Sequence, residues 1–282
     1  RSSLLVGQTW HPLFGEVLPS IVNLNTGCPF QPFSRSPQLQ YNYKFSRFNL
    51  KAAAVFQNQY RSSGPLGSKM LEYSRDAVLP EMFAGIDYRK EGFIVGVGAD
   101  VLTLTPRTQS TKGELTYKVS ERNVSASLLA FASYSSEWWK LNAKTIYGQN
   151  NVHTLSLGGY GVTSIDPVTG AYDYVNFNHS TSWVNVVYGK KWQVGLFGGF
   201  TKNLGTNKPL VSSSMTYGMG MDIDKLYNMS VQTDYNIKNF TIGVEYSYSV
   251  ADYGTIQTAT GKVTNTHAAD NHRIAALCNY SF

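Results

Sequence analysis

The side chains with reactive or metal-binding groups are few in this chain of 282 residues. The five histidines are His11, His153, His179, His267 and His272. No two of them have the i,i+2 or i,i+4 spacing that places two ligands on one face of a strand or helix, so no metal site and no cofactor are predicted. We interpret both cysteines, Cys28 and Cys278, as unpaired, the first in a loop and the second on the outer face of a strand.

Two pairs of polar residues are candidate chemical sites. Asp270 and His272 share one face near the start of the last strand, and an Asp–His pair can activate water. Asp222 and Asp224 offer two oxygens to a calcium ion, which is a poor start for a site that needs six or more. Both arrangements are also typical of polar loop ends. The sequence therefore predicts that the protein is not an enzyme.

The composition excludes several classes of protein. Apolar residues make up 42% of the chain, charged residues 15% and aromatic residues 13%. That content is too apolar for a disordered chain and too poor in charge for a coiled coil. No window holds the roughly 18 apolar residues of a membrane-spanning helix. The net charge of +6 comes from scattered basic residues, so no nucleic-acid partner is expected.

Alternation with a period of two dominates the chain and predicts about twelve β-strands. In one strand, for example, Phe240, Ile242 and Val244 alternate with Thr241 and Gly243. The expected strands are 3–11, 37–45, 48–61, 81–90, 92–106, 117–135, 138–154, 175–189, 191–203, 216–237, 239–256 and 267–282.

The connections between these strands alternate between tight and long. The tight ones are 46–47, 91, 136–137, 190 and 238, and the long ones are 12–36, 62–80, 107–116, 155–174, 204–215 and 257–266. Transmembrane barrels have short turns at the periplasmic end and long loops at the extracellular end. A soluble β-sandwich, the competing interpretation, mixes loop lengths at both ends.

Aromatic residues flank every tight turn, as an interfacial girdle would require. The pairs are Phe45/Phe48, Tyr88/Phe93, Tyr134/Trp139, Tyr188/Trp192 and Tyr235/Phe240. The last strand ends in Tyr280 and Phe282, an aromatic ending typical of bacterial outer-membrane barrels. We therefore predict an all-β fold, an antiparallel transmembrane β-barrel that forms one domain over 1–282 and resides in the bacterial outer membrane.

A family resemblance begins in the first loop. The segment Gly7-Gln8-Thr9-Trp10 is followed by a Phe- and Pro-containing loop and then by Arg35-Ser36-Pro37-Gln38, which opens the next strand. Over about 40 residues (7–41) this resembles the DcaP-type trimeric porins of Gram-negative outer membranes. Cys28 in the loop and Gln40, where the family has a basic residue, depart from the family pattern.

The resemblance implies a trimeric barrel of about sixteen strands, of which an N-terminal part would be missing here. A complete twelve-stranded barrel also fits the parity of the count. Loop 12–36 would then be the loop that folds into the lumen and narrows it; the alternative is a packed surface loop. Its expected constriction residues are Trp10, Phe14, Glu16, Phe30 and Phe33. Inward glycines leave room where a loop could pack; they are Gly96, Gly98, Gly195 and Gly199.

Strand register assigns charged side chains to the lumen. The basic candidates are Lys44, Lys51, Arg61, Arg89, Lys140, Lys144 and Arg273, and the acidic ones are Asp87, Asp100, Asp234 and Glu245. Arg35, at the end of the loop, is a further pore-lining candidate. The excess of basic groups predicts a mildly positive lumen, because such charges set ion preference. A competing interpretation is that these charges only pair with one another across strands.

Taken together, these features predict an outer-membrane porin that passes small polar solutes, anionic or zwitterionic, by passive diffusion. The expected partners are outer-membrane lipid and lipopolysaccharide, further copies of the chain in a trimer, and proteins of an envelope complex. The alternative function is that of a plugged barrel acting as a structural subunit of a larger outer-membrane complex.

Overall fold

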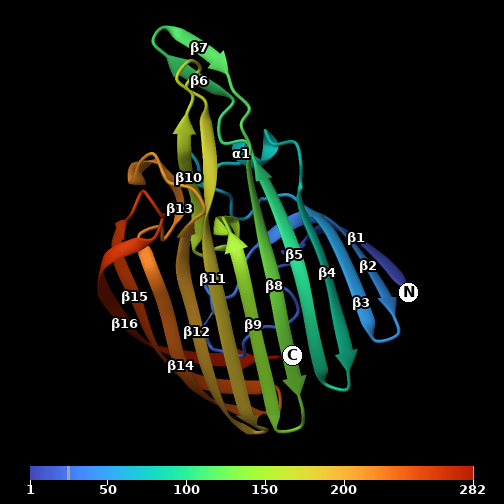
Figure 1. Ribbon diagram of the computed structural model, residues 1–282. Coiled ribbons are helices and arrows are strands. Elements are labelled where there is room, and N and C mark those ends of the chain that lie inside the picture. Colours follow the sequence, from blue (N-terminus) through green and yellow to red (C-terminus); the bar gives the residue numbers. More distant parts are fainter. Residues whose placement is uncertain (24–25, 282) are drawn as a thin grey trace.

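The structure, a computed structural model, describes residues 1–23 and 26–281 and consists mainly of β-strands (Figure 1). Twelve strands follow one another along the main sheet: β1 (Ser2–Trp10), β2 (Arg35–Phe45), β3 (Phe48–Val55), β4 (Glu81–Lys90), β5 (Phe93–Leu104), β8 (Asn123–Ser135), β9 (Trp139–Gln149), β11 (Tyr172–Gly189), β12 (Trp192–Thr206), β14 (Ile223–Ile237), β15 (Phe240–Ile256) and β16 (Val263–Tyr280). Every neighbouring pair in this order is antiparallel.

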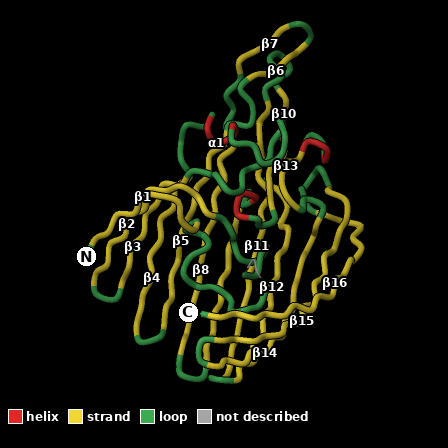
Figure 2. Tube along the Cα trace, turned by 180° about the vertical axis from the view of Figure 1, so that it is seen from behind, coloured by secondary structure: helices red, strands yellow, loops and turns green. Residues whose placement is uncertain are grey.

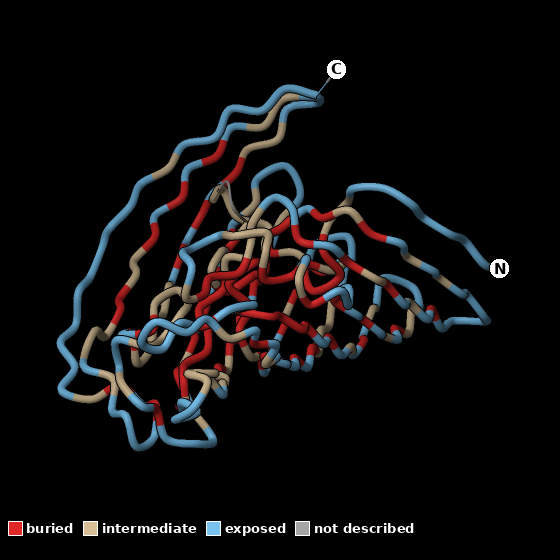
Figure 3. Tube along the Cα trace, turned by 90° about the horizontal axis from the view of Figure 1, so that it is seen from above, coloured by how far each residue is buried: buried red, intermediate tan, exposed pale blue. Residues whose placement is uncertain are grey.

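The sheet is strongly curved, and its concave side holds much of the buried chain (Figure 3). Among the described residues, β1 and β16 each pair with a single main-sheet neighbour and not with one another. The described chain thus forms the curved wall of a barrel whose two edge strands are not joined. This order of strands confirms the prediction of an antiparallel β-barrel fold.

Tight turns lie at one end of the sheet and long connections at the other (Figures 1 and 2). The long connections carry shorter elements: α1 (Glu72–Arg75), β6 (Gln109–Lys112), β7 (Leu115–Lys118), η1 (Val152–Thr154), β10 (Gly158–Ile165), η2 (Ser213–Met215) and β13 (Thr216–Met219). The hairpin β6–β7 stands farthest from the tight turns (Figure 1). None of the described helices is long and apolar enough to cross a membrane.

Several predicted strands end earlier than expected. β3 stops at Val55 instead of residue 61, because Gln57 and Ser62 bond to one another and fold the chain into the following connection. β9 stops at Gln149, where Asn150 takes a positive φ of 52° and the chain turns into η1. The expected strand 216–237 is divided into β13 and β14 at Gly220, whose φ of 62° suits glycine.

Burial follows the predicted alternation. Along β12, the outward Val194 and Leu196 are 51% and 55% exposed, whereas the intervening Gly195 and Phe197 are buried. The aromatic rings expected at the tight turns lie on this outward face; Tyr188 packs against Trp139, and Trp192 packs against Tyr235. An exposed apolar face with an aromatic belt at one end suits contact with lipid. Tyr280 is exposed, and Phe282 lies outside the described residues.

Candidate functional site

The connection between β1 and β2 folds back onto the concave face of the sheet and contacts strands far from it in sequence. Its contacts come from β9, β11, β12 and β15. Loops of this length usually run over a surface, because a buried backbone needs hydrogen-bond partners. The wall strands supply those partners here.

Strand β9 provides three polar side chains to the loop, all on its concave face. The Lys144 ammonium donates to the carbonyl oxygens of Phe14 and Leu13. The Asn142 side-chain amide donates to the Leu18 carbonyl oxygen at 3.0 Å. Lys140, nearer the tight turns, donates to Ser20 Oγ at 2.7 Å. Two inward residues of this strand therefore bond to the loop backbone and a third bonds to a loop side chain.

Strand β11 holds the loop at two further points. The Trp183 indole Nε1–H donates to Gln31 Oε1 at 3.0 Å, and Gln31 Nε2 in turn donates to the Phe14 carbonyl oxygen at 2.7 Å. Asn185 Oδ1 accepts the backbone N–H of Ser20 at 2.8 Å. Trp183, Gln31 and Asn185 are fully buried, so these bonds are shielded from water.

The opposite wall, β15, contributes Glu245. Its Oε2 accepts the backbone N–H of Val22 at 2.9 Å, and its Oε1 accepts from Arg273 of β16 at 3.2 Å. Glu245 is 1% exposed, so both contacts compensate a buried carboxylate. The loop is therefore attached to both sides of the space enclosed by the concave face, which we call the hollow.

Apolar packing reinforces these bonds. One cluster joins loop residue Leu13 to wall residues Ala53, Val55, Phe83, Leu129 and Ile146. A second joins Val17 and Phe30 of the loop to Trp183 and Phe197. Phe30 fits because Gly199 has no side chain: a Cβ there would lie 2.6 Å from the ring. Gly96, Gly98 and Gly195 instead face wall side chains.

Several charged side chains on the concave face form ion pairs. Glu16 of the loop forms ion pairs with Arg89 of β4 and, at 3.6 Å, with Lys51 of β3. Arg89 also pairs with Asp87, which accepts a 2.9 Å bond from Asn49. Pairing across strands, the competing interpretation of these charges, describes Arg273 and Glu245, whereas Lys51 and Arg89 pair with the loop.

Two lysines on this face combine exposure to solvent with the lack of an acidic partner. Within the described part of the chain, neither Lys44 nor Lys140 forms an ion pair with an acidic side chain, and both are exposed. Both lie near the tight-turn end of the sheet. The unpaired charge that solvent can reach at this end of the hollow is therefore basic.

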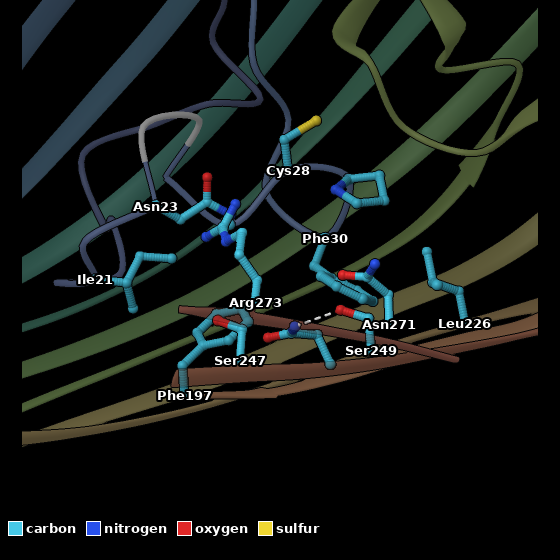
Figure 4. A pocket seen from close by; sticks show the side chains of 13 residues that line it. Ile21, Asn23, Cys28, Phe30, Phe197, Leu226, Ser247, Ser249, Asn271 and Arg273 are labelled. Atoms are coloured by element: carbon cyan, nitrogen blue, oxygen red, sulfur yellow. Dashed lines mark hydrogen bonds between the residues drawn. The ribbon is translucent and has the colours of Figure 1, made fainter. Parts of the chain in front are cut away.

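A cavity of about 180 Å³ separates the loop from β12, β14, β15 and β16 (Figure 4). Its loop side carries Ile21, Asn23, Gly27, Cys28, Pro29 and Phe30, and its wall side carries Phe197, Leu226, Asn228, Ser247, Ser249, Asn271 and Arg273. Arg273 extends from β16 toward the loop, beside Asn23 (Figure 4). Asn228 Nδ2 donates to Ser249 Oγ at 2.7 Å. A polar wall thus faces a partly apolar loop across this cavity.

The structure places most of the predicted lumen residues on the concave face. Lys44, Lys51, Asp87, Arg89, Asp100, Lys140, Lys144, Asp234, Glu245 and Arg273 all have the alternation parity of the buried wall residues. Arg61 does not lie on a strand, because β3 ends before it. The Arg35 guanidinium lies 4.3 Å from the centroid of the Trp10 ring and does not line the cavity.

The expected constriction residues separate into two groups. Trp10, Phe14 and Phe33 form an aromatic cluster at the base of the loop, with 4.2 Å between the stacked Trp10 and Phe14 rings. Phe30 reaches the cavity, and Glu16 reaches the basic side chains of β3 and β4. The loop therefore presents an apolar residue to one side of the hollow and a charge to the other.

One group of neighbouring side chains was not predicted from the spacing of residues in the sequence. His11 and His153 both contact Glu81 in the folded chain, although 142 positions separate the two histidines. Asp270 and His272 do lie 3.3 Å apart, but on exposed outward sheet, where His272 contacts Tyr246. The polar residues that hold the loop, namely Gln31, Trp183 and Asn185, were also not predicted from the sequence. The available signal was Trp183, an inward tryptophan among polar neighbours.

Cys28 is unpaired, as expected, and its Sγ donates to the Leu155 carbonyl oxygen at 3.3 Å. Burial disfavours the thiolate and raises the pKa of this thiol to about 12. Cys28 is therefore protonated at neutral pH while the loop stays in place.

Comparisons with known proteins establish the fold. No protein-family model and no curated protein matches the sequence. The structure is similar to the outer membrane channel DcaP of Acinetobacter baumannii, with a TM-score of 0.71 and 16% identity over 99% of this chain and 71% of that chain. It is also similar to OmpT, an outer membrane protein of Vibrio cholerae, with a TM-score of 0.58 and 11% identity over 99% of this chain and 76% of that chain. A trimer form of OmpT gives a TM-score of 0.54 at 12% identity, over 99% of this chain and 77% of that chain. The chain therefore has the fold of outer-membrane β-barrel channels.

Proposed function

We propose that the protein is an outer-membrane diffusion channel of the porin type, with loop 12–36 as its constriction. The observation that carries this proposal is the loop itself, which crosses the concave face and bonds to β9, β11 and β15. The fold shared with outer-membrane channels supports the same conclusion.

The solutes we propose are small, polar and anionic or zwitterionic. Glu16 is paired with Lys51 and Arg89, and Glu245 is paired with Arg273. Asp100 and Asp234 form no ion pair among the described residues, but both are buried. Lys44 and Lys140 lack acidic partners among the described residues, so the accessible excess is positive near the tight turns. Charges lining a narrow path set its ion preference.

Passage through the cavity would exchange water around a solute for fixed polar groups of the wall. Arg273 suits a carboxylate, and the neighbouring Asn271 and Ser249 suit hydroxyl or amide groups. Ile21 and Phe30 on the loop side narrow the opening without binding a polar solute. Weak contacts of this kind permit both entry and release, as diffusion requires.

The proposed surroundings are outer-membrane lipid and lipopolysaccharide, and we propose a homo-oligomer, a trimer, as the assembly. The outward apolar face supports contact with lipid, and the OmpT trimer form supports oligomerisation. Unpaired strand edges are costly in lipid, so conduction requires that the edges of β1 and β16 be paired in the membrane.

Single-channel recording of the purified full chain in a planar bilayer tests the channel. Stepwise openings are expected, and under a salt gradient the reversal potential should have the sign of anion preference. Clear cation selectivity would overturn the solute proposal. A folded, inserted protein that never conducts would overturn the channel and favour a plugged structural subunit.

A further inference from the structure

A fully buried cluster of four ligand-type side chains lies where the loop leaves the sheet. His11 follows β1, Glu81 begins β4, Asp100 belongs to β5 and His153 lies in η1. Each of the four is at most 2% exposed. The Glu81 Oε1 lies 3.0 Å from His11 Nε2 and 2.8 Å from His153 Nε2. The Asp100 carboxyl is within hydrogen-bonding reach of Glu81.

This cluster leaves polar atoms without partners. Among the described residues, Glu81 Oε2, Asp100 Oδ1 and His153 Nδ1 are buried and form no hydrogen bond to a donor or acceptor. No lysine or arginine of the described chain pairs with Glu81 or Asp100. Buried polar groups are normally satisfied, and a buried carboxylate normally has a counter-charge. Two adjacent carboxyl groups therefore call for a positive species between them and the imidazoles.

We propose that His11, Glu81 and His153, with Asp100 beside them, bind one divalent transition-metal ion of the Zn²⁺ class. Two neutral imidazoles and two carboxylates balance a charge of +2, and imidazole nitrogen with carboxylate oxygen is a donor set that Zn²⁺ accepts. The ligand atoms of His11, Glu81 and His153 already lie within 4.8 Å of one another.

Binding requires small adjustments. Ligand atoms around a tetrahedral ion at 2.0–2.1 Å lie about 3.3 Å apart, so both histidine nitrogens move away from Glu81 Oε1 by a few tenths of an ångström. The Leu13 backbone N–H, which donates to His11 Nδ1 at 3.2 Å, must give up this bond, because a ring bound through Nε2 carries its proton on Nδ1. The ion replaces the Leu13–His11 hydrogen bond and the two hydrogen bonds between the imidazoles and Glu81, and it supplies the counter-charge that the two buried carboxyl groups lack.

The ion would join segments that the chain connects only through long loops. His11 marks the start of the proposed constriction loop, Glu81 a wall strand and His153 the connection after β9. Phe33 N–H also donates to the Thr154 carbonyl oxygen at 2.8 Å, so the end of the loop meets the same connection. Metal binding at this point contributes directly to folding stability.

The test measures metal in the folded full chain. The protein is stripped with a chelator, equilibrated with Zn²⁺ or Co²⁺, freed of excess ion and analysed by elemental mass spectrometry and by Co²⁺ absorption. One ion per chain is expected. Glu81→Gln and His153→Gln should weaken binding by about 100-fold or more. Circular dichroism and heat-modifiable migration on gels verify that each variant folds.

His179→Gln is the matched control. His179 is also buried, with both ring nitrogens unpartnered among described residues, but it lies in β11 outside the cluster. This variant should keep one ion per chain. Absence of a stoichiometric ion in the unaltered protein overturns the proposal and makes the cluster a hydrogen-bonded anchor. An ion that survives both cluster substitutions, or is lost equally in the control, also overturns it. None of these readouts depends on conductance, so the channel proposal is tested separately.

Discussion

Glu16 is the acidic side chain that the loop presents to the basic wall. It faces Lys51 and Arg89 and is itself 44% exposed, so its charge is accessible to ions in the hollow. Surface ion pairs add little to stability, but their removal changes the local potential. Lys51 has Glu16 as its acidic partner, whereas Arg89 also pairs with Asp87, so loss of Glu16 frees Lys51 and leaves Arg89 with one partner.

Replacing Glu16 by Gln is expected to increase anion preference with little loss of stability, below about 1 kcal/mol, because the pair is partly solvated. The reversal potential under a salt gradient measures the preference, and urea unfolding measures the stability. Glu137→Gln is the control, since Glu137 pairs with Lys190 at an exposed tight turn. An unchanged reversal potential in the Glu16 variant would show that this pair lies off the ion path.

At the scale of elements, the loop and the wall depend on one another. The loop forms hydrogen bonds with inward side chains of β9 and β11, and the apolar residues of the loop pack against the wall strands. A loop held by this many buried bonds opens only when several are lost, because each contributes about 0.5–1.5 kcal/mol. Cys28 lies within the loop and reports on its position.

Cys28 is expected to resist maleimide at pH 8 in the folded protein, because burial keeps its pKa near 12 and the reagent needs the thiolate. In a Cys278→Ser background, the double substitution Lys144→Met and Asn142→Leu removes the two buried tethers from β9 and should expose Cys28 to labelling. Mass spectrometry counts the labels. If Cys28 in the Cys278→Ser parent were labelled as fast as an exposed thiol, this result would contradict the buried position of the loop.

The Cys28 experiment needs a variant that leaves the loop in place. Lys190→Met serves, because Lys190 pairs with Glu137 at a tight turn and contacts the Trp138 ring, far from the loop. Labelling of Cys28 in this variant should stay as low as in the Cys278→Ser parent.

The whole molecule has two faces of opposite character. Its convex face exposes Met229, Leu196 and Val194, whereas its concave face buries polar and charged side chains beneath the loop. A soluble sheet protein would bury the apolar face. The aromatic rings at the tight turns mark one boundary of the outward band.

Brominated lipids test this orientation. Trp138, Trp139 and Trp192 are exposed at the tight-turn end, so their fluorescence should be quenched more by bromine near the headgroups than by bromine at the bilayer midplane. Trp183, which is 1% exposed on the concave side, should be quenched by neither. Single-tryptophan variants separate the signals. Strong quenching of Trp183 by lipid bromine would reverse the assignment of the two faces.

The local sequence pattern is sufficient to predict much of this architecture. Alternation around Val244 and Phe240 shows the strand and its two faces, and the rings beside short turns show which end meets the membrane boundary. These properties depend on neighbours one or two residues apart, which is why the barrel fold and the inward parity of Lys144 and Arg273 follow from the chain itself.

Only the tertiary structure decides what meets across the hollow. The curvature of the sheet brings His153 and His11 to Glu81, and it pairs Glu16 with Arg89, although no spacing along the chain relates them. The ends of β3 and β9 also depend on side-chain bonds and turns outside the strands. Contacts between distant segments depend on how the sheet curves and on which loop packs against its concave face. The alternation of residues along a strand carries no information about either.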